Sequence, residues 1–235
     1  MKQIERLTKS DFNREGVQVP SSVKNVGLDL MDTPSDFNNG EIKRLLRKPS
    51  ELYRNFDDWY CKSSRDAMKS NFFFDEELRR GITNFSKEKN NIPGLERYFL
   101  VLSIDDVPAG ISILKNTCDE KKISTFTLEE KYKNAGLASY LMSRSLDFLG
   151  KSDVSITVNE DVLDELYPFL IKKGFVVDKK VLGEYWKNKN EYHFFKVKMN
   201  VTQYTYTIEE LFFTPSLDIS NPPASYFFKA PTFIA

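Results

Sequence analysis

The chain has 235 residues, enough to bury a hydrophobic core in one large domain or two small ones. Its 34 lysines and arginines balance 34 aspartates and glutamates, and a formal net charge of zero argues against a protein that binds nucleic acid through its overall charge. No stretch approaches the roughly 20 apolar residues of a membrane-spanning helix, and residues 1–6 lack the apolar run of a signal peptide. We therefore expect a cytoplasmic protein with no membrane partner.

The two cysteines give no sign of a cross-link or a metal site. Cys61 and Cys118 lie far apart in the chain, and neither belongs to a CxxC motif. This spacing predicts no disulfide framework and no bound metal. Buried free thiols in a reducing compartment are the expected state.

The first predicted region, residues 1–95, combines a short strand with helices. The strand opens the chain, and a loop marked by Gly, Pro, Asn and Asp runs through Gly40. A short basic helix is expected over Glu41–Arg47, a second helix capped by Ser50, and a third capped by Asp75. Three aromatic residues recur at helical spacing on the second helix and are expected to face the core: Phe56, Trp59 and Tyr60.

A run of basic residues lies over the first two of these helices. Its members are Lys43, Arg44, Arg47, Lys48 and Arg54. Such a run is most often a solvated helix face. The alternatives are that these residues bind an RNA backbone, an acidic protein, or the ribose phosphate of a cofactor.

The second predicted region, residues 96–199, alternates strands with helices. It begins with a β-hairpin in which Asp105 and Asp106 form the turn, and Gly174 ends its second helix as a left-handed cap. The expected strands are Tyr98–Ile104, Ala109–Leu114, Lys122–Leu128, Val154–Val158, Phe175–Val181 and Tyr192–Lys198, and the expected helices are Ala135–Leu149 and Asp161–Lys173. This order predicts an α/β (α+β) domain with a mixed sheet flanked by helices.

The third predicted region, residues 200–235, is a C-terminal extension. It carries one more expected strand, Tyr204–Ile208, followed by an end rich in proline and aromatic residues from Asn221 to Phe233. That composition excludes a regular helix, and we expect the extension to pack on the body of the protein, with a partly disordered tail as the alternative.

The segment from Ile123 to Met142 carries the strongest functional signal. A strand runs into a tight turn, and the turn opens directly into a helix. Small residues at Ala135, Gly136 and Ala138 let an anionic group approach the backbone closely, and a lysine precedes them. The unpaired N–H groups at the start of a helix favour negative charge, as does the helix dipole. The pattern therefore predicts an anion site.

The same turn resembles the acetyl-CoA signature of the GNAT superfamily, which has Arg or Gln, two variable residues, Gly, one variable residue, and Gly or Ala. Gly136 and Ala138 match the two small positions, and Lys133 stands at the Arg or Gln position. The family's second signature, an aromatic-bearing helix that ends in Gly-Phe, is similar to Phe169–Phe175. The resemblance covers about residues 98–198 and the first dozen residues of the chain.

The resemblance implies a GNAT-like, mostly antiparallel sheet with a helical N-terminal insertion, and an N-acetyltransferase with acetyl-CoA as its co-substrate. A primary amine would attack the thioester directly, so catalysis would come mostly from positioning and from stabilising the oxyanion. The backbone of Phe126 and Leu128 would pair with the pantetheine arm like an added strand. The pyrophosphate would be held by the residues of the turn: Lys133, Asn134, Ala135, Gly136, Leu137, Ala138 and Ser139.

Two departures from the family pattern bear on the site. Many family members have a Tyr four residues before the Gly of Gly-Phe, where it protonates the leaving thiolate, and here Leu170 holds this position. Tyr167, one helical turn away, is the candidate in its place, with a packed helix aromatic as the alternative. Lys133 keeps the charge of the family's Arg but loses its forked geometry. Glu129 and Glu130 follow the central strand and are the candidate general bases, with solvated loop carboxylates as the alternative.

Three interpretations of function stay open at this point. The first is an N-acetyltransferase whose amine acceptor is a small molecule, a protein or an aminoacyl-tRNA, although the balanced charge argues against nucleic acid. The second is a catalytically inactive CoA-binding module that serves a protein partner, which Leu170 favours. The third is an interaction domain in which residues 133–138 are a plain connection between a strand and a helix.

Overall fold

The computed structural model describes residues 1–31, 33–53, 55–79, 97–117, 119–150 and 153–196, and for residues 69–79 it describes the backbone alone. The predicted strand at Tyr204–Ile208 and the C-terminal extension lie outside these residues.

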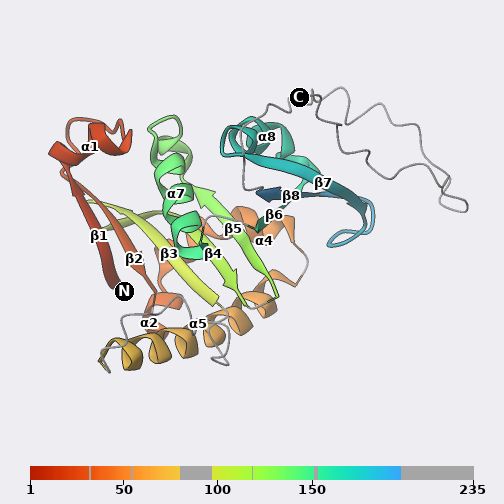
Figure 1. The fold of residues 1–235 in the computed structure, drawn as a ribbon, viewed down its shortest axis with the longest axis horizontal. Helices are drawn as coiled ribbons and strands as arrows, with labels where there is room; N and C mark the ends of the chain where they lie inside the picture. The colour runs from red at the N-terminus through yellow and green to blue at the C-terminus, as the bar shows by residue number, and fades with distance from the viewer. Residues whose placement is uncertain (32, 54, 80–96, 118, 151–152, 197–235) are drawn as a thin grey trace, which may run out of the picture. The chain divides into compact units, whose positions relative to one another are not determined.

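The described strands form one eight-stranded sheet with the order β1-β2-β3-β4-β5-β6-β8-β7 (Figure 1). All neighbouring strands are antiparallel except β5 and β6, which are parallel. The strands are β1 (Lys2–Thr8), β2 (Asn25–Leu30), β3 (Arg97–Ile104), β4 (Val107–Asn116), β5 (Lys121–Leu128), β6 (Val154–Asn159), β7 (Phe175–Leu182) and β8 (Asn190–Lys196). The predicted mixed, mostly antiparallel sheet flanked by helices is confirmed.

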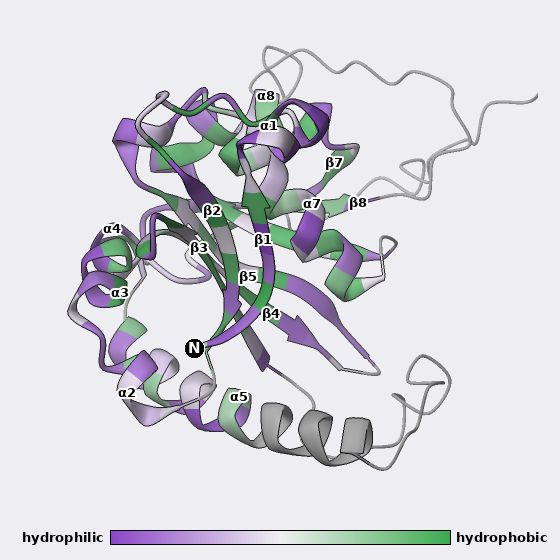
Figure 2. Ribbon diagram, turned by 90° about the vertical axis from the view of Figure 1, so that its left-hand side faces the viewer, coloured by the Kyte–Doolittle hydropathy of each residue, from purple (hydrophilic) through white to green (hydrophobic). Residues whose placement is uncertain are grey.

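Helices cover both faces of the sheet. The α-helices are α1 (Lys9–Glu15), α2 (Pro34–Phe37), α3 (Gly40–Leu45), α4 (Arg47–Leu52), α5 (Phe56–Arg79), α7 (Leu137–Leu149) and α8 (Leu163–Lys172), and the 3-10 turns are η2 (Glu130–Tyr132) and η3 (Glu160–Val162). Helix α7 lies across one side of the central strands, while α2 to α5 lie on the opposite side (Figures 1 and 2).

Alternation along the central strands explains why both faces are covered. Successive side chains of a strand point to opposite faces. Phe99 of β3 belongs to the core that also holds Phe56 of α5, whereas the ring of neighbouring Tyr98 lies 4.5 Å from Phe148 of α7, centroid to centroid. Strand β3 is therefore almost continuously apolar, and burial on both faces stabilises it at roughly 25 cal/mol per Å² of apolar surface.

Most elements predicted for the second region are confirmed within a few residues. The hairpin turn is made by Asp105 and Asp106, whose φ angles of 46° and 68° fit the left-handed conformation that tight hairpin turns require. The helix that was expected from Asp161 starts as a 3-10 turn and becomes α8 at Leu163. Gly174, with φ 81°, follows it as predicted.

The predictions for the first region were wrong in three places. The expected loop before Gly40 contains α1, strand β2 and α2. Gly27 and Asp29 have low strand propensity, but pairing with β3 and a 2.8 Å hydrogen bond from Ser103 Oγ to the Asp29 carboxylate override it. Ser50 also caps no helix, because it lies within α4 and its hydroxyl donates to the Arg47 carbonyl oxygen.

The helix predicted to start at Asp75 does not start there. Helix α5 runs without a break from Phe56 through Asp75 to Arg79. No Gly or Pro interrupts this span, so helix formation propagates past a residue that could have served as a cap. The aromatic residues were predicted correctly as core: Phe56 is buried, and Trp59 and Tyr60 pack against the same cluster. Cys61 of the same helix is exposed, so the expected burial of its thiol was wrong.

Gly136 sits where two distant segments of backbone meet. It has φ 75°, and a Cβ atom added to it would lie 1.9 Å from the carbonyl oxygen of Gly16. The contact is reinforced by a 2.8 Å hydrogen bond from the Gln18 N–H to the Ala135 carbonyl oxygen. Only glycine therefore fits at this position, for steric reasons as well as for its backbone angle.

Glu191 of β8 is fully buried and lies opposite Asn159 of β6. One carboxylate oxygen accepts a 2.7 Å hydrogen bond from Asn159 Nδ2, and the other has no hydrogen-bond partner among the described residues. Burial raises the pKa of Glu191 to about 7, against the opposing effect of the Asn159 hydrogen bond. The folded state therefore binds the Glu191 proton more tightly than the unfolded chain does.

We predict that Gly136→Ala destabilises the protein more than Gly16→Ala. Both glycines have positive φ, which costs about 1–2 kcal/mol for alanine, but a Cβ at Gly16 meets no atom within 4 Å. The added clash at Gly136 should cost a further ~1–3 kcal/mol, measured by urea unfolding. Equal losses in the two variants would contradict the close approach.

We also predict that Glu191 makes stability fall as pH rises. Its pKa of about 7 exceeds the ordinary value of 4.5, so between these values the folded state binds more protons than the unfolded state. The free energy of unfolding should therefore decrease from pH 5 to pH 8. In Glu191→Gln, which keeps an acceptor for Asn159, this part of the decrease should vanish. Identical pH dependence in urea unfolding of the two proteins would refute the assignment.

Candidate functional site

The parallel strands β5 and β6 pair only briefly and then separate. Their register contains three pairs, the last of which joins Ile123 to Ile156. On the other side of β5, the register with β4 shifts after Ile123, so that Ser124 is an extra, bulged residue. A bulge bends its strand and increases its twist. The bend therefore opens a V between β5 and β6 at Ser124.

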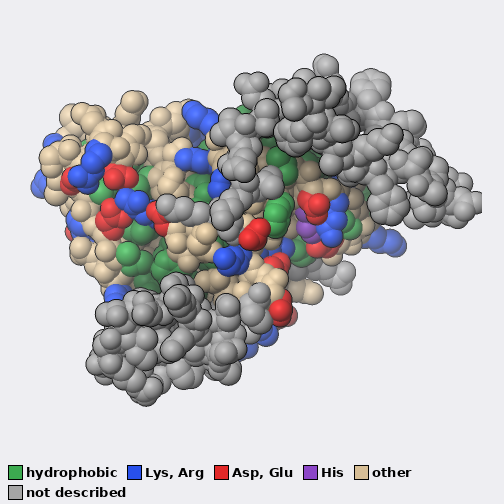
Figure 3. Space-filling model, viewed as in Figure 1, with side chains coloured by type: hydrophobic (Ala, Val, Ile, Leu, Met, Phe, Trp, Pro, Cys, Tyr) green, Lys and Arg blue, Asp and Glu red, His purple; other side chains and the backbone are tan. Residues whose placement is uncertain are grey.

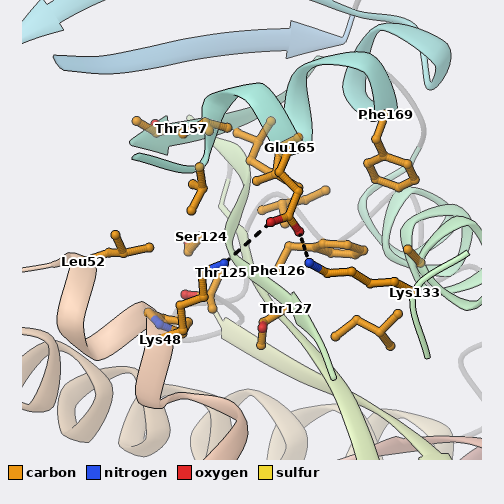
Figure 4. Close-up of a pocket in the computed structure, with 18 of the residues that line it drawn as sticks. Lys48, Leu52, Ser124, Thr125, Phe126, Thr127, Lys133, Thr157, Glu165 and Phe169 are labelled. Carbon is orange, nitrogen blue, oxygen red and sulfur yellow. Dashed lines mark ion pairs between the residues drawn. The ribbon is translucent and has the colours of Figure 1, made fainter. Parts of the chain in front are cut away.

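A cavity of about 290 Å³ fills this V (Figure 4). Its walls come from β5, β6, helix α8, the end of helix α4 and the turn before α7. The lining residues are Lys48, Pro49, Leu52, Tyr53, Ile123, Ser124, Thr125, Phe126, Thr127, Leu128, Glu130, Lys133, Asn134, Ala138, Ile156, Thr157, Val158, Val162, Glu165, Leu166 and Phe169. Phe126 and Leu128, the two residues predicted to bind the pantetheine arm, both line this cavity.

The edge of β5 that faces the cavity is a strand edge without a neighbour in the described sheet. Residues 125–128 pair with β4 on one side, and the register with β6 has already ended at Ile123. An open edge presents unpaired N–H and C=O groups, which an extended ligand can bind as an added strand. The wall behind it is apolar, with the rings of Phe126 and Phe169 stacked at 6.0 Å.

The start of α7 forms one end of the cavity. Gly136 is the N-cap residue and no side chain caps the helix, so the N–H groups of its first turn have no intrahelical acceptor. Asn134 and Ala138 line the cavity, whereas Leu137 is fully buried. The side of Gly136 on which a Cβ atom would stand is filled by the backbone of Gly16, so the missing side chain is required by that contact.

Four charged side chains gather at the mouth of the cavity. Lys133 Nζ lies 2.6 Å from a Glu130 oxygen and 2.8 Å from a Glu165 oxygen, and Lys48 Nζ lies 3.6 Å from Glu165 (Figure 4). Hydrogen bonds to Glu130 and then Glu165 raise the pKa of Lys133, and the hydrogen bond from Lys133 lowers the pKa of Glu165. Lys133 is thus held at the mouth as a cation shared by two carboxylates.

Two of the three candidate catalytic residues lie away from the cavity. Glu129 is paired with Arg44 of α3 and with Lys131, and it is not a lining residue. Tyr167 is buried, with its ring 6.1 Å from that of Phe194. Glu130 lines the mouth, but its side chain is 82% exposed. None of these three side chains therefore lies deep in the V, where a catalytic group would be needed.

The basic run is divided between two roles. Arg44 pairs with Glu41 and Glu129 on the body of the protein, while Lys48 reaches the mouth of the cavity. Lys43 and Arg47 are exposed, and Arg54 lies outside the described residues. The described part of the run is thus mostly a helix face, with Lys48 as the member at the site.

Tyr53 is the site residue that sequence reasoning missed. It lines the cavity, and it also lines a second cavity of about 330 Å³ that shares Ser124, Thr125 and Thr157 with the first. Burial raises the pKa of the Tyr53 phenol, with the nearby Glu191 carboxylate as a further cause. No local signal marked it, because Tyr53 follows α4 in an ordinary helix-rich segment, and only the tertiary fold brings it to the V.

The chain's one histidine lies apart from the first cavity. His193 of β8 pairs with Glu184 of the loop between β7 and β8, and Figure 3 shows it beside acidic side chains on the face in view. Across the described residues, no group of His, Cys, Asp and Glu is arranged to hold a metal ion. In the same part of the chain, no helix has the length and apolar character needed to cross a membrane.

Comparison with known proteins gives matches of structure alone. No family model matches the sequence, and no curated protein matches it either. Naa50 from Arabidopsis thaliana, solved with the bisubstrate analogue CoA-Ac-MVNAL, is 16% identical with a TM-score of 0.50 and covers 72% of this chain and 96% of its own. Ard1 from Thermoplasma volcanium is 17% identical (TM-score 0.48, 74% and 98% covered), and a GNAT-family acetyltransferase from Bacillus cereus is 16% identical (TM-score 0.46, 73% and 98% covered). The chain therefore has the fold of the GNAT-family acetyltransferases.

Proposed function

We propose that the protein transfers an acetyl group from acetyl-CoA to a primary amine. The observation that carries this proposal is the V between β5 and β6, which joins an open strand edge to an uncapped helix start in one cavity. The open strand edge suits an extended arm that contains amides, and the uncapped helix start suits a diphosphate at the end of that arm. Acetyl-CoA has that structure, and Naa50, which has this fold, was solved with an analogue that contains CoA.

Each part of the co-substrate has a proposed partner. The pantetheine amides pair with the backbone of Phe126 and Leu128 along the open edge of β5. The diphosphate lies against the turn of residues 134–139, where first-turn N–H groups and the helix dipole favour negative charge. Lys133 and Lys48 supply cations at the mouth. The thioester then lies near Ser124, where the strands separate.

The chemistry proposed for this site is direct attack by the amine on the thioester carbonyl carbon. A C–N bond forms and the C–S bond breaks, the amine nitrogen loses a proton, and the departing thiolate gains one. Tyr53 is the proposed proton donor to the thiolate, because it lies where the two cavities meet and a phenol carries its proton at neutral pH. It replaces Tyr167, which the fold directs into the core.

The acceptor class stays open within this proposal, and a peptide N-terminus is one candidate, since Naa50 was solved with a CoA–peptide analogue. A second candidate function is a CoA-binding module without turnover, which is favoured because Glu129 and Tyr167 lie outside the cavity. The release of free CoA thiol from acetyl-CoA, measured with and without amines, distinguishes the two functions. A transferase releases CoA only when an amine acceptor is present, whereas the module binds acetyl-CoA and releases none with any amine in a panel.

We predict that Ala138→Glu abolishes the binding of acetyl-CoA. Ala138 lines the cavity in the first turn of α7, so a carboxylate there would occupy and repel the diphosphate position. Saturating acetyl-CoA should raise the melting temperature of the wild-type protein by about 5 °C or more and leave this variant unchanged. Ala138→Ser is the matched control and should keep the shift. A full shift in Ala138→Glu would place the ligand elsewhere.

We predict opposite effects for the two members of the mouth ion pair. Lys133→Met removes a cation and should weaken CoA binding by roughly three- to tenfold. Glu165→Gln removes a carboxylate that competes with the diphosphate for Lys133 and Lys48, and it should strengthen binding by about two- to fivefold, more at low salt. Calorimetric titration at two salt concentrations measures both. Weaker binding in both variants would contradict the competition.

A further inference from the structure

The second cavity lies on the other side of the point where β5 and β6 separate. It meets the first cavity at Tyr53, Ser124, Thr125 and Thr157, but none of its lining residues comes from the turn before α7. Its volume of about 330 Å³ is in the range of sites for small molecules. A molecule held there would reach the V from the side opposite to the diphosphate position.

The charged residues that line this cavity are mostly cations. They are Arg97, Lys115, Lys122 and a single carboxylate, Glu120. Lys115 Nζ lies 2.7 Å from Glu120, so this pair is neutral as a unit. Lys122 is half-buried and forms no ion pair within the described part of the chain. The cavity wall therefore holds a cation without a matching acid among the residues that line it.

The environment of Lys122 makes an anionic ligand favourable. Burial lowers the pKa of Lys122, and the fields of Glu120 and Glu184 only partly offset this effect. A partly desolvated ammonium group gains more from a paired anion than an exposed one does. Arg97 adds a second positive charge that the structure fixes in place, since its guanidinium donates a 2.8 Å hydrogen bond to Ser124 Oγ and lies 5.6 Å from the centre of the Trp59 ring.

Aromatic side chains form the rest of the wall. Phe56 and Trp59 come from α5, and Tyr185 comes from the loop between β7 and β8, where its ring lies 5.2 Å from that of Tyr53. These rings offer apolar surface for the body of a small molecule, while the cations lie at β3, β4 and the start of β5. The wall is thus divided into an apolar part and a cationic part.

We propose that this second cavity is the acceptor site and that the acceptor is a small primary amine carrying an oxyanion, a carboxylate or a phosphate, which Lys122 binds. This inference rests on the proposed acetyl transfer. The amino group then points to the junction at Ser124 and Thr125, and the anionic group stays at the start of β5. Lys122 is a specificity-determining residue that contacts the acceptor, and it takes no part in proton transfer.

The test compares amines that differ only in the anionic group. Phenylalanine is paired with phenethylamine for the carboxylate, and O-phosphoethanolamine is paired with ethanolamine for the phosphate. For the wild-type protein, kcat/KM for acetylation should be at least about tenfold higher for the anionic member of one pair than for its partner without the anionic group. The pair that shows this preference tells whether the bound group is a carboxylate or a phosphate. Lys122→Met should abolish this preference. Lys121→Met is the matched control. Lys121 is the neighbour of Lys122 in β5, so its side chain points to the opposite face of the strand, and it lines neither cavity.

Calorimetric titration of the same four amines, with and without CoA, separates the two proposals. Failure of acetyl-CoA to raise the melting temperature would sink the acetyl-transfer proposal, whereas binding of an anionic amine that is lost in Lys122→Met would still support the anion site. The inference is overturned if both members of each pair bind and react equally, or if the preference survives in Lys122→Met.

Discussion

The site depends on how little of β5 pairs with β6. Two parallel strands of this length would normally hydrogen-bond throughout, but the extra residue Ser124 on the β4 side turns β5 away after three pairs. That single irregularity creates the cavity and leaves a strand edge exposed inside the protein. An unpaired edge is usually a liability that folds cover or shorten. Here it is enclosed by α8 and the end of α4, so it is accessible to a ligand but not to another sheet.

A second constraint holds the helix start in position. The backbone of Gly16, from the segment after α1, packs directly on Gly136, and Gln18 donates to Ala135. The turn before α7 is therefore braced from the N-terminal side of the protein, which fixes the direction in which its free N–H groups point. Preorganised dipoles of this kind bind an anion without a cost of rearrangement.

Sequence reasoning predicted the elements between Tyr98 and Lys196 because their patterns are local. Strong alternation, a two-aspartate turn and a glycine after α8 each determine structure over a few residues. Strand β2 escaped prediction because it contains Gly27 and Asp29 and is stabilised by pairing with a strand about 75 residues away in the chain, as its register shows. The same limit applies to Tyr53 and Lys122, whose relation to the V exists only after the sheet forms.

The two cavities draw their walls from different stretches of the chain. The turn at residues 133–138 contributes to the first cavity alone, whereas residues 55–59 and the loop between β7 and β8 contribute to the second alone. Only Tyr53 and three residues of β5 and β6 belong to both. If the proposed assignment of the two cavities holds, substitutions in α5 or in that loop change the molecule that the second cavity accepts and leave the binding of acetyl-CoA unchanged.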